Sequence, residues 1–170
     1  MTSQDDIIFC EQQSFAFWLR SFIVFSMLVA MGVVLFELFQ KRAELKPANL
    51  PTAIAVIIII SVVMTLLFYS AKLKTQVQND GLYIKFFPFH LRYKKFSADN
   101  IAQCFSRQYK PIREYGGWGI RCSWCGAGKA YNVSGNQGVQ IIFENGKKLL
   151  IGSQKPQELA LAIKKIMPKQ

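Results

Sequence analysis

The sequence predicts a membrane-anchored α+β protein, in which two membrane-spanning helices precede a small β-rich domain that ends in a helix. Two long apolar runs occupy the first 71 residues, and most basic residues follow them. Beyond residue 71, short aromatic and β-branched segments alternate with turn signals. The 170 residues are 51% hydrophobic and 18% charged, which excludes a disordered chain, and the length excludes a large multidomain enzyme.

The two apolar runs are predicted to form a transmembrane hairpin, after an N-terminal segment of residues 1–17. The first span is expected at about 18–39, where Trp18 and Arg20 suit a membrane interface. The second span is expected at about 50–71 and is rich in Ile and Val. About 20 apolar residues cross a hydrocarbon layer. A buried helix of a soluble protein is the alternative for each run, but two runs in tandem favour the hairpin.

The charge distribution favours a cytoplasmic position for both termini. Residues 1–71 carry four basic and five acidic side chains, whereas residues 72–170 carry 17 basic and five acidic ones. An even number of spans places both ends on one side, and the basic end is expected beside the anionic cytoplasmic leaflet. Within the runs only Arg20 and Glu37 are charged, each close to one end of the first run, so the hairpin is interpreted as an anchor rather than a transport path.

Residues 72–170 are predicted to form one antiparallel β domain. Asn79-Asp80-Gly81 and Asn145-Gly146 are hairpin-turn signals. Leu159, Ala162, Ile163 and Ile166 share one face of a predicted helix over 153–167. The order resembles a pleckstrin-homology-like barrel closed by a C-terminal helix, although a sandwich fits the pattern too. The predicted strands cover 75–78, 82–89, 92–96, 101–109, 130–133, 138–144 and 147–151.

Four segments carry a family resemblance: Tyr83–His90 (YIKFFPFH), Tyr109–Arg121 (YKPIREYGGWGIR), Ala130–Asn136 (AYNVSGN) and Leu150–Pro156 (LIGSQKP). The chain resembles a family of small bacterial membrane proteins of unknown function, over nearly its whole length. The resemblance implies two N-terminal spans, a C-terminal domain similar to bacterial pleckstrin-homology domains and a place in the bacterial inner membrane. It implies no biochemical activity. The sequence departs from the family pattern at Cys122-Ser123-Trp124-Cys125.

A basic cluster interleaved with aromatic residues is the first candidate binding surface. Lys85, Arg92, Lys94 and Lys95 surround the aromatic residues of the segment 83–96. Such a pattern occurs in nucleic-acid-binding proteins, but a membrane tether favours anionic lipid headgroups, so no nucleic acid is expected. A solvated basic face without a ligand is the alternative.

A glycine-rich segment is the second candidate. Gly116-Gly117-Trp118-Gly119 lies between basic residues, and glycine permits a positive φ or a close backbone approach. The segment is interpreted either as a binding loop at the mouth of the barrel or as a tight turn whose tryptophan fills the barrel. The candidate residues are Arg113, Tyr115, Trp118 and Arg121.

No catalytic residue and no cofactor is predicted. The five carboxylates after residue 71 have structural explanations, including turns and a helix start. The candidates for a metal or redox site are Cys104, Cys122, Cys125 and His90, although the Cys-x-x-Cys pair lacks a second pair and a second histidine. Ordinary reduced thiols are the favoured interpretation.

These observations predict a non-enzymatic integral membrane protein that presents its basic domain at the cytoplasmic surface, as a scaffold or adaptor. The expected partners are the bilayer itself, anionic lipid headgroups or an unidentified membrane or cytoplasmic protein. The alternative is an accessory subunit of a larger membrane complex, with the hairpin as its interface. A cysteine-based metal or redox protein is a further alternative.

Overall fold

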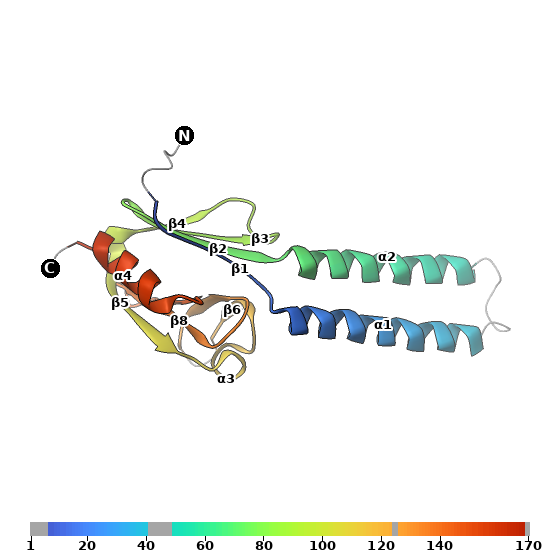
Figure 1. Cartoon of the computed structure of the whole chain (residues 1–170). Helices are drawn as coiled ribbons and strands as arrows, with labels where there is room; N and C mark the ends of the chain where they lie inside the picture. The colour runs from blue at the N-terminus through green and yellow to red at the C-terminus, as the bar shows by residue number, and fades with distance from the viewer. Residues whose placement is uncertain (1–6, 41–48, 124–125, 169–170) are drawn as a thin grey trace. The chain divides into compact units, whose positions relative to one another are not determined.

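A computed structural model describes residues 7–40, 49–123 and 126–168. The chain divides into two compact units (Figure 1). The helical unit consists of residues 15–70, and the β unit consists of residues 1–14 together with 71–170. The elements, in chain order, are β1 (Ile7–Ser14), α1 (Phe17–Gln40), α2 (Asn49–Ser70), β2 (Lys72–Gln78), β3 (Gly81–Phe87), β4 (Lys94–Ser97), the 3-10 helix η2 (Ala98–Asn100), β5 (Ile101–Gln108), α3 (Pro111–Tyr115), β6 (Gly119–Cys122), β7 (Lys129–Asn132), β8 (Gln137–Phe143), β9 (Lys148–Gly152) and α4 (Pro156–Ile166).

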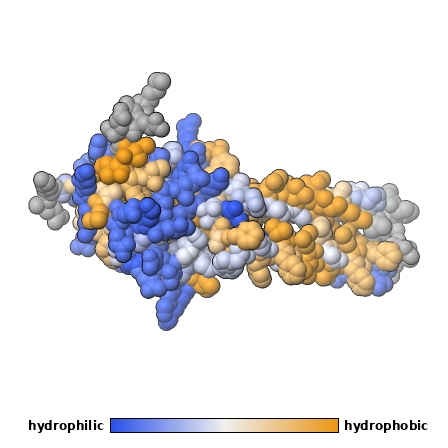
Figure 2. Space-filling view, in the orientation of Figure 1, coloured by the Kyte–Doolittle hydropathy of each residue, from blue (hydrophilic) through white to orange (hydrophobic). Residues whose placement is uncertain are grey.

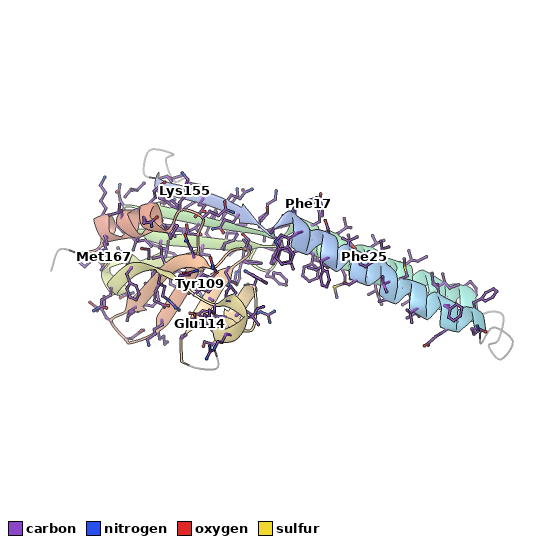
Figure 3. All side chains as sticks on the ribbon, turned by 60° about the horizontal axis from the view of Figure 1, so that its bottom comes forward. Phe17, Phe25, Tyr109, Glu114, Lys155 and Met167 are labelled. Atoms are coloured by element: carbon purple, nitrogen blue, oxygen red, sulfur yellow. The ribbon has the colours of Figure 1, made fainter. Side chains whose placement is uncertain are left out.

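The helical unit consists of α1 and α2, which lie side by side (Figure 1). Apolar side chains cover both helices (Figure 2), and Phe17 and Phe25 project from α1 with 81% and 65% of their surface exposed (Figure 3). Among the described helices, α1 alone is long and apolar enough to cross a membrane, because the apolar part of α2, Ile54–Ser70, is shorter. The segment 41–48 between them lies outside the described residues.

The first sheet of the β unit is an antiparallel meander in the order β1-β2-β3-β4. The turn signal at 79–81 joins β2 to β3, as predicted, with Gln78 opposite Gly81. Alternate side chains of β2 and β3, among them Leu73, Val77 and Ile84, are buried. This alternation gives the sheet an inner face on the core and an outer face in solvent.

The second sheet has the order β5-β8-β9-β7-β6. The Asn145-Gly146 turn joins β8 to β9 as predicted, but β7 pairs with β9 in parallel. Gly128 permits this approach, because its φ is +84° and a Cβ there would lie 2.0 Å from the Lys148 carbonyl oxygen.

The predicted closed antiparallel barrel is therefore not what the structure has. In the described residues the nine strands form two separate sheets, and the second sheet is mixed rather than antiparallel. The physical reason is that β5 takes β8 as its partner after η2 redirects the chain, so no ladder of hydrogen bonds joins β4 to β5. The coarser prediction, an α+β chain with an apolar N-terminal helix and β-sheets, is confirmed.

Helix α4 contacts strands of both sheets. Its buried residues, Leu159, Ala160, Ala162 and Ile163, recur at helical spacing, while Leu161 on the opposite face is 67% exposed. Lys164 and Lys165 in the last turn complement the helix dipole. The predicted amphipathic C-terminal helix is thus present, and it covers the core between the sheets.

The strand β1 belongs to the β unit although it precedes both apolar helices. It pairs with β2 from Ile7 to Ser14 and forms an edge of the first sheet. Glu11 accepts hydrogen bonds from the Ser153 hydroxyl at 2.6 Å and the Gln154 backbone N–H at 2.9 Å. The buried Gln13 side chain donates to the Gly152 carbonyl at 2.8 Å. The predicted domain boundary at residue 72 therefore leaves out β1, which hydrogen-bonds to the residues just before α4.

Candidate functional site

The outer face of the first sheet carries three lysines around one hollow. Lys72 and Lys74 extend from β2, and Lys85 extends from β3. Together with Gln12 and Phe87 they line a hollow of about 210 Å³. We call these three lysines the basic row.

The basic row follows from the strand register. Lys74 lies directly opposite Lys85 on β3 and Gln12 on β1, and Lys72 lies opposite Phe87. Like charges at directly opposed positions destabilise a sheet. None of the three lysines pairs with a carboxylate of the described residues. The fold therefore places concentrated positive charge without a counter-charge, and a bound anion would relieve that repulsion.

One lysine of the predicted cluster differs, because Lys95 is neutralised. Its ammonium lies 2.6 Å from the Asp80 carboxylate, which also accepts a hydrogen bond from the Tyr83 hydroxyl at 2.7 Å. The hydrogen bond that Lys95 donates to Asp80 raises the pKa of Lys95, and the hydrogen bonds that Asp80 accepts from Lys95 and then from Tyr83 lower the pKa of Asp80. This ion pair removes Lys95 from the set of free cations.

The structure also separates Lys94 from the basic row. Lys94 lies opposite Ile84, whose side chain is buried, so Lys94 extends from the inner face of the sheet. Its neighbour Lys95 extends from the outer face, because successive side chains of a strand alternate. It lines a second hollow of about 600 Å³ with the exposed Cys122 and with residues of β7, β8 and β9. Arg92 is exposed in the segment between β3 and β4. The predicted cluster is thus divided between two faces, and Lys72 and Lys74 replace Lys94 and Lys95 beside Lys85.

The glycine-rich segment forms the connection between α3 and β6. Gly116 ends α3 in the left-handed conformation, at φ +72°. The Trp118 indole N–H donates to the Gly135 carbonyl at 3.0 Å, and the Arg121 guanidinium donates to the Trp118 carbonyl at 3.2 Å. Trp118 is half-buried, while Arg113 and Arg121 are exposed. The segment is a turn with an anchored tryptophan, on a different sheet from the basic row.

Tyr115 is not a surface residue. It is 1% exposed and packs edge-on against Tyr109, whose position Figure 3 labels, with ring centroids 6.1 Å apart. Its hydroxyl donates to the Ala127 carbonyl at 3.3 Å, and burial raises the pKa of the phenol. We therefore correct its assignment from binding surface to core.

The cysteine and histidine candidates do not converge among the described residues, where no group of three or more possible metal ligands occurs. Cys104 is buried beneath α4, its thiol 3.4 Å from the Ala160 carbonyl oxygen, and burial raises its pKa to about 11. Cys122 is exposed on β6, and the His90 ring packs against Tyr131 with centroids 5.8 Å apart. Cys125 lies outside the described residues.

A comparison with models of protein families finds a match over nearly the whole chain. The model of a family of unknown function, DUF6141, matches residues 2–168. The chain belongs to the DUF6141 family. The match confirms the predicted membership of an uncharacterised family, and it assigns neither membrane spans nor a pleckstrin-homology-like domain to DUF6141. No curated protein and no solved structure matched the DUF6141 chain significantly.

Lys72 and Lys74 are not among the binding residues predicted from the sequence, because they directly follow the second apolar run. The available signal was the alternation Lys72-Leu73-Lys74-Thr75, which is typical of a strand with one polar face. Their assembly with Lys85 depends on the β2–β3 register, which the turn at 79–81 sets.

Proposed function

We propose that the chain is an integral membrane protein that binds anionic lipid headgroups at the membrane surface through the basic row. The observation that carries this proposal is the unpaired positive charge around one hollow, on a strand that directly follows an apolar helix. Ala71 alone separates Ser70, the last residue of α2, from Lys72. Each lysine near an anionic bilayer surface contributes about 1 kcal/mol of attraction.

Strand pairing supports two spans rather than one. β1 precedes α1, β2 follows α2, and seven residues of β1 pair with residues of β2. Paired strands lie on the same side of a membrane, so the chain between Ser14 and Lys72 crosses an even number of times. If α1 crosses, α2 therefore crosses as well. The apolar part of α2, Ile54–Ser70, has 17 residues, the lower end of the usual range.

We propose a pleckstrin-homology-like character for the β unit, with a scaffold or adaptor role and no enzymatic activity. Two packed sheets of mainly antiparallel strands and a C-terminal amphipathic helix support this comparison. The 17 basic residues after residue 71 support a cytoplasmic position, on the anionic leaflet of a bacterial inner membrane.

Amine labelling of the full chain tests the proposal. The chain is reconstituted in nanodiscs of phosphatidylcholine or phosphatidylglycerol, treated with a water-soluble acetylating ester and digested for mass spectrometry. We expect the basic row to be acetylated several-fold more slowly in phosphatidylglycerol, and the difference to disappear at high salt. Lys129 on β7 and Lys164 on α4 serve as internal controls. Equal rates for the basic row in both lipids would contradict headgroup binding and favour the accessory-subunit alternative.

A charge-matched pair of variants sharpens the test. Two double variants change the net charge by the same amount: the first combines Lys74→Glu with Lys85→Glu, and the second combines Lys129→Glu with Lys164→Glu. Only the first pair is expected to reduce the phosphatidylglycerol retained by the purified protein. An equal loss in both would indicate attraction by net charge alone.

A further inference from the structure

The segment between β3 and β4, residues 88–93, exposes large apolar side chains. Phe89 is 68% exposed and Leu91 is 72% exposed. Tyr93, at 39%, and Phe87, also at 39%, flank them. Exposed apolar side chains that are contiguous in the chain mark an interaction surface more often than scattered ones do. We call residues 88–93 the apolar loop.

The loop is held in place at its base. The His90 backbone N–H donates to the Phe86 carbonyl at 2.7 Å. The Phe89 ring packs against Phe86, which is 1% exposed, with centroids 5.8 Å apart, and the His90 ring packs against Tyr131. The exposure of Phe89 and Leu91 is therefore a property of an anchored loop.

The register fixes the end of the sheet at which the loop lies. Phe87, the last residue of β3, is opposite Lys72, and Lys72 is opposite Ser14. Lys72 follows α2 after one residue, and Ser14 precedes α1, which begins at Phe17. Consecutive Cα atoms are about 3.8 Å apart, so the chain enters and leaves the apolar helices at this end of the sheet. The apolar loop continues from the same end.

Basic residues accompany the apolar loop. Arg92 lies next to Leu91 in sequence, and the Lys85 ammonium lies 5.6 Å from the Tyr93 ring centroid. Aromatic and aliphatic side chains beside lysine and arginine form the composition of segments that enter the boundary between headgroups and acyl chains. A soluble protein partner would not explain why the chain enters both apolar helices at the end of the sheet where the loop lies. We therefore favour the bilayer as the partner of the apolar loop.

We infer that the apolar loop inserts Phe89 and Leu91 into the headgroup–acyl boundary of the membrane that the helices cross. The inference rests on the proposed membrane function and adds a contact to it: the basic row binds headgroups, while the loop enters the layer beneath them. The two contacts together would fix the β unit against the bilayer surface instead of leaving it free to rotate about its two connections.

A photo-crosslinking experiment on the full chain tests the inference. Benzoylphenylalanine replaces Phe89 or Leu91, and the protein is irradiated in phosphatidylethanolamine–phosphatidylglycerol nanodiscs. Leu161 and Ile112, which are 67% and 70% exposed on α4 and α3, provide matched controls, and Phe25 on α1 provides a positive control. We expect phospholipid adducts at 89, 91 and 25, several-fold above those at 161 and 112, by mass spectrometry.

Adducts at 89 and 91 no more abundant than at 161 and 112 would overturn the inference. Crosslinks from 89 to a second copy of the chain would overturn it in favour of self-association. The two proposals can fail separately. Protection of the basic row without adducts at 89 would reject the loop alone, and the absence of both would reject headgroup binding as well.

Discussion

Glu114 attaches the short helix α3 to the second sheet through a charge that acid can remove. Its carboxylate accepts hydrogen bonds from Arg107 at 2.8 Å and from the Lys110 backbone N–H at 2.7 Å. Burial acts to raise the pKa of Glu114, but these bonds outweigh it, and the pKa lies below the usual 4.5. A pKa that is lower in the folded state stabilises the fold above the unfolded value. That stability is lost as the pH falls through the folded value.

We predict that Glu114→Gln lowers the free energy of unfolding at neutral pH by about 1–2 kcal/mol, because it removes the ion pair with Arg107. The effect stays modest because both Glu114 and Arg107 are partly exposed. The deficit should start to shrink as the pH falls below 4.5 and should be lost once the pH falls below the lowered pKa of the folded state, where the wild-type carboxylate is protonated as well. Thermal unfolding of the full chain in detergent measures it. Glu158→Gln, which breaks only the exposed pair with Lys155, is the control and should have little effect. A deficit that does not change with pH would contradict the assignment.

Tyr115 marks the limit of sequence analysis at the residue scale. It lies between charged Glu114 and a run of glycines, a context that predicts an exposed loop. The five-residue helix α3 is too short for its periodicity to be detected, and it turns Tyr115 into the core. The lysines of the basic row, in contrast, lie on strands with a regular alternation. Their exposed orientation could be predicted, but their convergence required the register.

At the scale of elements, the hairpins could be predicted and the distant pairings could not. Asn79-Asp80-Gly81 and Asn145-Gly146 fix two antiparallel pairs locally. The parallel β7–β9 pair and the β1–β2 pair join segments that no turn connects. β1 also carries Glu11, Gln12 and Gln13 in succession, a polar run of low strand propensity. Its strand conformation therefore depends on its tertiary partners.

We predict that Glu11→Ala combined with Gln13→Ala destabilises the β unit by about 2–4 kcal/mol, because three hydrogen bonds to residues 152–154 are lost. Gln12→Ala, on the exposed face of the same strand, is the matched control and should change stability little. Protease susceptibility of the reconstituted full chain, followed by mass spectrometry, compares the two variants. Equal resistance of the double variant and the control would show that these side-chain hydrogen bonds do not stabilise the β unit.

At the scale of the whole molecule, the proposed even number of crossings leads to a testable topology. A phosphatase that is active only outside the cytoplasm is fused after Glu44 or after Gln170. We expect activity after Glu44 and none after Gln170, because the proposed topology puts residues 41–48 between two spans and both termini in the cytoplasm. Inactivity of both fusions would indicate that neither helix crosses. The reverse pattern would place the β unit outside.

The contacts of β1 also set an order of events during synthesis. β1 leaves the ribosome before both helices, yet β2 begins at Lys72 and the residue that accepts the hydrogen bond of Gln13 lies 139 residues later. Both apolar helices are complete long before Gly152 and Ser153 are made. The β unit therefore cannot finish folding until both helices and the chain as far as residue 154 have been translated. Under the proposed topology, a chain in which only one helix crossed would leave β1 and β2 on opposite sides of the membrane, so the sheet could not be completed.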